Sequence, residues 1–189
     1  MQADTFYHIY NHANGNENLF RNDENYSFFL QKWAKYIEPI ADTYAYCLMP
    51  NHFHVLVKIK TEEELLWGKN LSGLLSKQFS NLFNSYAKAY NKMYERKGSL
   101  FNRPFKSKLV SDDNYLTTLI YYIHHNPIHH GFTKYFHDWL HCSYLIILSD
   151  KDTFLLRKKV IEWFGNKEEL IRFHKHSIQD IEKIEIEFT

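Results

Sequence analysis

Cysteine is scarce in this chain, whose 189 residues include only Cys47 and Cys142. Two cysteines so far apart form neither the disulfide framework of a small secreted domain nor a Cys-x-x-Cys zinc motif. Long apolar runs are also lacking, and none approaches the length that crosses a bilayer. The first residues do not show a basic segment followed by an apolar one. We therefore expect a soluble, cytoplasmic protein without a membrane partner.

An excess of charge of either sign is lacking too, because 23 Lys and Arg nearly balance 22 Asp and Glu, for a net charge of +1. The distribution is nevertheless uneven, since one segment holds seven basic residues and a single acid, Glu95. Its basic residues are Lys88, Lys92, Arg96, Lys97, Arg103, Lys106 and Lys108. Such a segment is either an electrostatic footprint for a nucleic-acid backbone or a solvated helix end and loop.

What is abundant is apolar and aromatic residues, at 44% and 17%, enough to bury one good-sized core. Apolar periodicity predicts strands at 5–12, 43–48, 52–60 and 105–110, and helices at 26–37 and 71–93. This order predicts an α+β, ferredoxin-like fold with an RRM-like antiparallel sheet. A further helix is expected from Ser111-Asp112-Asp113 towards Asn126-Pro127, because a hydroxyl and two acids suit a helix N-terminus. Short helices are expected after residue 135.

Two histidines in the third predicted strand, His52 and His54, are two residues apart. Their side chains should leave one face of the sheet, while Phe53, Val55 and Val57 enter the other. Paired imidazoles are suited to holding a metal ion. In a chain with 12 histidines, however, such a pair is also compatible with ordinary surface or half-buried positions.

A second group lies on the late helix, where Tyr122 and Asn126 are four residues apart and share one helix face. Asparagine supplies a hard oxygen ligand, and a phenol is a nucleophile. Taken alone, a tyrosine in this position is more often a core aromatic, and an asparagine before proline is more often a turn residue that ends a helix. Tyr121, one residue earlier, lies about 100° around the helix from Tyr122.

The motifs Met49-Pro50-Asn51-His52-x-His54 and Tyr122-Ile123-His124-x-Asn126-Pro127 resemble those of the HUH single-tyrosine transposases, particularly the REP-associated and insertion-sequence members. Further matching stretches begin at Tyr7 and Arg103, so the resemblance covers about residues 5–147. It implies a transposase-like domain over residues 1–147 and a helical C-terminal extension over residues 148–189. One departure is Ile128-His129-His130-Gly131, where relatives usually carry an arginine, so no phosphate contact is assigned there.

The resemblance implies a metal-dependent enzyme that cuts and rejoins single-stranded or hairpin-flanked DNA through a 5′-phosphotyrosine. His52 and His54 would be metal ligands, Asn126 would complete the set, and Tyr122 would attack. Tyr121 competes for this role, but Tyr122 is the residue that matches the family tyrosine four before the asparagine. Mixed nitrogen and oxygen donors suit Mg²⁺ or Mn²⁺, although imidazoles also accept Zn²⁺ or Ni²⁺. Some relatives exchange the tyrosine helix within a dimer and others work as monomers, so a homodimer is one of two alternatives.

The basic segment would then contact the DNA backbone, with Tyr86, Tyr90 and Tyr94 either stacking on bases or packing in the core. One rival interpretation is a non-catalytic module that binds single-stranded DNA or RNA. Another is a zinc-dependent hydrolase that uses the histidines at 124, 125, 129 and 130. Adjacent helix residues point to different faces, however, so these four make a poor single site.

Overall fold

The computed structural model describes residues 1–65, 71–110, 112 and 115–175. Its elements are β1 (Phe6–His12), α1 (Asp23–Tyr36), β2 (Ala41–Leu48), β3 (His52–Ile59), α2 (Glu62–Leu65), α3 (Leu71–Met93), β4 (Lys106–Val110), α4 (Leu116–His129), α5 (Tyr144–Leu148), α6 (Arg157–Phe164) and α7 (Lys167–Lys175). The strands form one sheet in the order β2-β3-β1-β4, and every neighbouring pair is antiparallel. The predicted α+β, ferredoxin-like fold class is confirmed.

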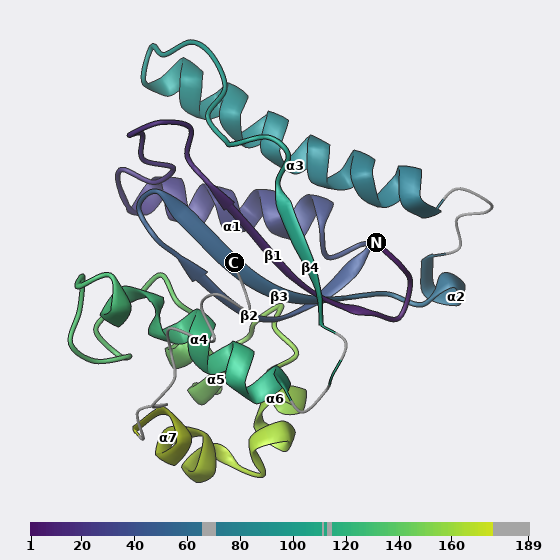
Figure 1. Cartoon of the computed structure of the whole chain (residues 1–189), viewed down its shortest axis with the longest axis vertical. Coiled ribbons are helices and arrows are strands. Elements are labelled where there is room, and N and C mark those ends of the chain that lie inside the picture. The colour runs from purple at the N-terminus through teal and green to yellow at the C-terminus, as the bar shows by residue number, and fades with distance from the viewer. Residues whose placement is uncertain (66–70, 111, 113–114, 176–189) are drawn as a thin grey trace.

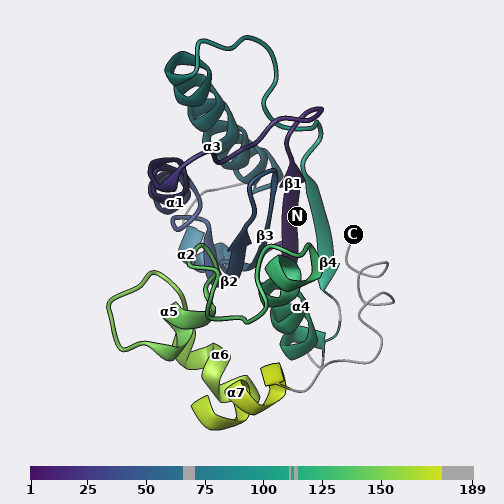
Figure 2. The same ribbon diagram turned by 90° about the vertical axis from the view of Figure 1, so that its left-hand side faces the viewer.

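One face of the sheet is covered by α1 and α3, which lie side by side (Figures 1 and 2). Helix α1 begins after Asn22, whose side-chain oxygen accepts from the backbone N–H of Asn25. Its apolar face carries Phe29 and Trp33, both fully buried. Phe29 meets Phe53 of β3 at 5.1 Å between ring centroids. The apolar residues of β3 thus face these two helices, as the alternation predicted.

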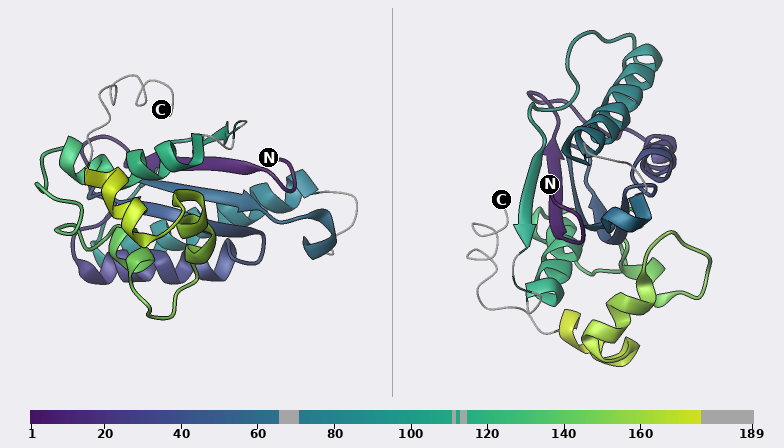
Figure 3. Two further views of the ribbon diagram at one scale, coloured as in Figure 1. Left: turned by 90° about the horizontal axis from the view of Figure 1, so that it is seen from below. Right: turned by 90° about the vertical axis from the view of Figure 1, so that its right-hand side faces the viewer.

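The opposite face is covered by α4, while the chain after α4 runs along the outer edge of β2 (Figure 3). Cys142 pairs with Cys47 in an antiparallel bridge, and Leu155 pairs with Thr43 in a parallel one. Trp139 donates its indole N–H to the Leu48 carbonyl at 3.0 Å. These contacts satisfy backbone groups that an uncovered edge strand would leave open.

Helix α4 differs from its predicted end. It continues through Pro127 to His129 instead of stopping at Asn126-Pro127. Proline removes the hydrogen bond that its own N–H would have made and crowds the carbonyl one turn earlier, but here Pro127 is buried in the fold. The Asn126 amide donates to the Tyr122 carbonyl at 2.9 Å, which adds a bond beside the missing one. Tertiary packing outweighs the local breaker signal.

Helix α2 has no counterpart among the predicted elements, whereas the short helices expected after residue 135 are present as α5, α6 and α7. The expected helix start at Ser111-Asp112-Asp113 falls largely outside the described residues. No helix among the residues that the structure describes combines the length and apolar character needed to span a membrane.

Candidate active site

The two histidines of β3 lie side by side on the face covered by α4. His52 is in register with His12 of β1, and His54 is in register with Tyr10. Directly paired residues of antiparallel strands share a face, so four aromatic side chains line one patch of the sheet. Because α4 covers it, His52 and His54 are only 3% and 2% exposed.

The hydrogen bond of His52 fixes which ring nitrogen can bind a cation. Its Nδ1 lies 2.8 Å from Asn51 Oδ1, and an amide oxygen only accepts, so Nδ1 carries the proton. Nε2 therefore keeps its lone pair, and it is buried with no hydrogen bond of good geometry. Burial lowers the pKa of His52 to about 3, assisted by His12 and His130, although the Asn126 side chain opposes the shift. His52 is thus neutral at physiological pH.

His54 is held through the same ring position. Its Nδ1 lies 2.9 Å from Nε2 of His8, a fully buried residue of β1. Burial lowers the pKa of His54 well below its ordinary value, and the neighbouring histidines lower it further. A neutral imidazole is the form that binds a metal ion, so both β3 histidines are in the binding form before any ion arrives.

Tyr122 reaches this patch from α4. Its ring stands edge-on to His54 at 5.5 Å between centroids and to His8 at 6.1 Å. Asn126, one turn later, is 2% exposed. Since its amide nitrogen donates to the Tyr122 carbonyl, its oxygen is the atom available as a ligand. The structure therefore brings together the predicted residues of β3 and α4.

Tyr121 faces a different part of the molecule. Its ring contacts His125, Phe136 and Phe173 at 5.4–6.0 Å, and it is 2% exposed. It packs between α4 and the C-terminal helices, as the 100° rotation along the helix predicted.

Four aromatic residues of the patch were not among the predicted site residues. They are His8, Tyr10, His12 and His130. The first three alternate along β1, and this period of two is visible in the sequence. His130 follows α4 and meets the His52 ring at 4.9 Å between centroids. Its position depends on α4 continuing past Pro127, which local signals did not predict.

The donor set fits a divalent cation. Among residues 1–65, 71–110, 112 and 115–175, no three His, Cys, Asp or Glu side chains converge on one point. The candidate set is instead two imidazoles and one amide, and the buried Nε2 of His52 makes no hydrogen bond of good geometry. A buried polar atom without a hydrogen bond costs roughly 1–3 kcal/mol, and coordination would remove that cost. Three ligands leave positions open for a phosphate.

The structure divides the basic segment between the two faces of the sheet. Lys106 is in register with Tyr10 and Lys108 with His8, so both belong to the face with the histidines. Lys88 and Lys92 are exposed on α3, over the other face (Figure 1). Lys97 and Arg103 are exposed in the connection from α3 to β4. Arg96 is mostly buried and pairs with Glu17 at 3.3 Å, so it holds a loop in place.

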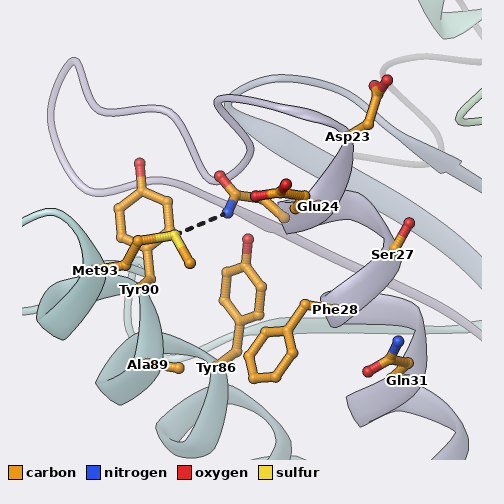
Figure 4. A pocket seen from close by; sticks show the side chains of 10 residues that line it. Asp23, Glu24, Ser27, Phe28, Gln31, Tyr86, Ala89, Tyr90 and Met93 are labelled. Atoms are coloured by element: carbon orange, nitrogen blue, oxygen red, sulfur yellow. Dashed lines mark hydrogen bonds between the residues drawn. The ribbon is translucent and has the colours of Figure 1, made fainter.

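Tyr86 and Tyr90 of α3, and Tyr94 just after its end, pack against neighbouring parts of the protein. Tyr86 and Tyr90 are buried and donate to the carbonyls of Leu19 and Asn18, and Tyr94 donates to Asn25. Two of them also line a pocket of about 490 Å³ between α1 and α3 (Figure 4). This pocket is on the face away from His52 and His54. The placement of Tyr86, Tyr90 and Tyr94 thus agrees with packing, which was the alternative to stacking on bases.

The histidines of α4 and its C-terminal end point in different directions, which removes the geometry that a zinc hydrolase needs. His124 bonds to Ser143 and His174, whereas His130 meets His52. His125 stacks on Tyr121 at 5.4 Å between centroids. These side chains do not converge on one point in the described part of the chain.

Comparisons with known proteins bear on the family and the fold. A protein of Haemophilus influenzae that is named for the REP-associated tyrosine transposases is 27% identical over 108 residues, which are 54% of this chain and 58% of that protein. The chain thus spans less than two thirds of that relative. A structure of a REP-associated tyrosine transposase bound to a REP hairpin shares the fold, with a TM-score of 0.64 at 14% identity, over 79% of this chain and 82% of the other. Residues 3–126, which include His52, His54, Tyr122 and Asn126, match the family described as IS200-like transposases, and the chain therefore belongs to that family.

Proposed function

We propose that this protein cleaves and rejoins single-stranded DNA through a covalent 5′-phosphotyrosine on Tyr122. The observation that carries the proposal is the contact of the Tyr122 ring with His54, beside His52 and Asn126. A nucleophile and a set of neutral nitrogen and oxygen donors meet at one place. Family membership adds that the chain is a DNA-processing enzyme of the transposase class.

His52, His54 and Asn126 would hold the cation, through Nε2 of His52 and the amide oxygen of Asn126. When bound, Mg²⁺ or Mn²⁺ supplies charge neutralisation to a phosphate oxygen. The protein's own residues do the rest. Tyr122 supplies the attacking oxygen, and α4 fixes its distance from the histidines. Lys106 and Lys108 attract the strand on the same face.

The chemistry exchanges one phosphoester for another. The Tyr122 phenolic oxygen bonds to phosphorus and loses its proton, while the bond from phosphorus to the 3′ oxygen breaks and that oxygen gains a proton. A second 3′-OH reverses these steps and releases the tyrosine. Because the number of phosphoester bonds is unchanged, rejoining needs no ATP.

Single strands and hairpin-flanked strands are the expected substrates. The histidines and Tyr122 are buried between α4 and the sheet, where a stacked duplex would not deliver a phosphate in line with the phenol. The fold neighbour bound to a REP hairpin is consistent with a hairpin-bearing partner.

The test is incubation with radiolabelled single strands from the DNA that flanks the gene, with MnCl₂, followed by a denaturing gel. We expect a protein band that carries label and disappears when EDTA replaces MnCl₂. A protein that binds these strands but forms no such band would be a non-catalytic binding module, and the proposal would be wrong.

A further inference from the structure

His8 is a buried histidine that the proposed chemistry does not use. It lies on β1, 0% exposed, two residues before Tyr10. Its Nε2 is 2.9 Å from Nδ1 of His54, and the two rings are nearly parallel at 20°. The Tyr122 ring is perpendicular to both. His8 therefore contacts a proposed ligand and the proposed nucleophile at once.

The contact between His8 and His54 holds one shared proton. Two neutral imidazole nitrogens at this distance form a hydrogen bond only when one carries a proton and the other accepts it. If His54 Nδ1 carries it, the lone pair of His54 lies on Nε2 and is available to a cation. If His8 Nε2 carries it, the proton of His54 lies on Nε2 and blocks that nitrogen.

His52 shows which arrangement the site favours. There the Asn51 oxygen forces the proton onto Nδ1 and leaves Nε2 as the free nitrogen. The two β3 histidines are thus bonded through the same ring atom to neighbours of different chemistry. Partners of this kind fix the tautomer and orientation of metal-binding histidines.

We propose that His8 is a positioning residue whose Nε2 accepts a hydrogen bond from the Nδ1–H of His54 and so directs the Nε2 lone pair of His54 towards the cation. The inference rests on the proposed metal site. The position of His8 beside His54 corresponds to that of Asn51 beside His52. Each β3 histidine then has one neighbour that sets its tautomer.

The direct test uses the unmodified full-length protein without metal. Long-range ¹⁵N–¹H NMR correlations of ¹⁵N-histidine-labelled protein report which ring nitrogen of His54 is protonated. We expect His54 to carry its proton on Nδ1. A proton on Nε2 would overturn the proposal without any variant having to fold.

A matched pair of variants separates hydrogen bonding from packing. Gln and Met have similar length and volume, but only the Gln amide oxygen is a good acceptor at the place of His8 Nε2. We expect His8→Met to lower the Mn²⁺ affinity, measured by calorimetry without DNA, by roughly 10–100-fold. His8→Gln should stay within about threefold of the wild type, on the same ground. Equal affinities for the two variants would mean that His8 only fills space.

The results also distinguish this inference from the proposed function. If the wild type forms the DNA adduct but His8→Met keeps its Mn²⁺ affinity and the Nδ1 tautomer of His54, the positioning role is wrong and the function stands. If His54 has the expected tautomer and the two variants differ as expected, but neither the wild type nor a variant forms the DNA adduct, the positioning role of His8 stands. The proposed function is then wrong.

Discussion

Tyr121 and Tyr122 are neighbours in the chain but face different parts of the molecule. Tyr122 contacts the histidines of the sheet, and Tyr121 packs against Phe136 and Phe173. The separation follows from the helical rotation of 100° per residue. It makes the adjacent tyrosine a natural control for the proposed nucleophile.

Replacing Tyr122 with phenylalanine removes the one atom that forms the intermediate and keeps the ring. We expect Tyr122→Phe to fold, bind Mn²⁺ and bind single strands, but to form no covalent adduct on a denaturing gel. Tyr121→Phe should still form it. Mass spectrometry of the trapped adduct locates the modified residue, and an adduct on Tyr121 would contradict the assignment.

His52 offers a test that needs no DNA. A cation at about 100 times its Kd stabilises a folded protein by about 2.7 kcal/mol, which for a chain of this size raises the Tm by roughly 5–10 °C. We expect MnCl₂ to raise the Tm of the wild type in a thermal melt and to leave that of His52→Ala unchanged. His137→Ala, at an exposed loop histidine, should respond as the wild type does. A full response from His52→Ala would exclude His52 as a ligand.

The residues of the site were predictable to different degrees. His52, His54, Tyr122 and Asn126 have spacings of two and four, which place each pair on one face of its own element. That the two pairs meet depends on α4 covering the histidine face, which spacing alone does not indicate. His8 is brought beside His54 by the register of β1 and β3.

Among the elements, β4 and α3 divide the basic residues that are close in sequence. Lys106 and Lys108 share the face of the histidines, while Lys88 and Lys92 are exposed on α3, the helix that lies over the other face (Figure 1). The density of charge along the sequence does not show on which face of the sheet the residues of a strand or a helix will lie. Lys106 and Lys108 therefore form one group of charges and Lys88 and Lys92 another, and the contact of either group with DNA stays a prediction.

This division gives a prediction about salt. Each phosphate neutralised on single-stranded DNA contributes about 0.7 to the slope of log affinity against log salt. We expect Lys106→Glu/Lys108→Glu to weaken binding to all strands and to flatten that slope by about 1.4 or more. Lys88→Glu/Lys92→Glu should leave the slope unchanged. Equal flattening in both variants would show that the strand also follows α3.

Most boundaries of the elements agree with the apolar periodicity, because α1, α3 and the strands each bury a regular stripe or face. Helix α4 is the exception. The expectation that proline ends a helix considers only the local backbone, whereas Pro127 is buried in the fold. The division of the chain at residue 147 stays a prediction, and α5 extends across that position.

Across the whole molecule, a chain of hydrogen bonds connects α7 through α4 to β2. His174 Nδ1 donates to the Leu170 carbonyl, so its Nε2 accepts from His124 Nδ1. His124 Nε2 then accepts from the Ser143 hydroxyl, whose oxygen accepts from the Tyr46 N–H. All of these side chains are buried and neutral. Histidine and serine are common in active sites, but a substrate has no access to these buried residues. The hydrogen-bond network is therefore structural.

Because His174 belongs to this hydrogen-bond network, we expect the stability of the fold to depend on pH. Burial lowers the pKa of His174 to about 4, helped by His125 and opposed by the Leu170 carbonyl, whereas an unfolded histidine titrates near 6.5. The contribution of neutral His174 is complete above pH about 6.5 and is lost as the pH falls towards about 4. The loss of this contribution should lower the free energy of unfolding by about 2 kcal/mol between pH about 7.5 and about 5.

Urea titrations at the two pH values check this expectation. His174→Gln should be less stable than the wild type at the higher pH but should lose about 2 kcal/mol less on acidification. His137→Gln, at an exposed position, should follow the wild type at both values. Parallel losses in the wild type and His174→Gln would show that other groups dominate acid unfolding.

The strand β3, which carries the histidines, is hydrogen-bonded on both sides, whereas Tyr122 is on a helix backed by residues after 126. The family match ends at that residue. Mutations in the later residues can therefore alter the reach of the tyrosine while the histidine strand stays as it is.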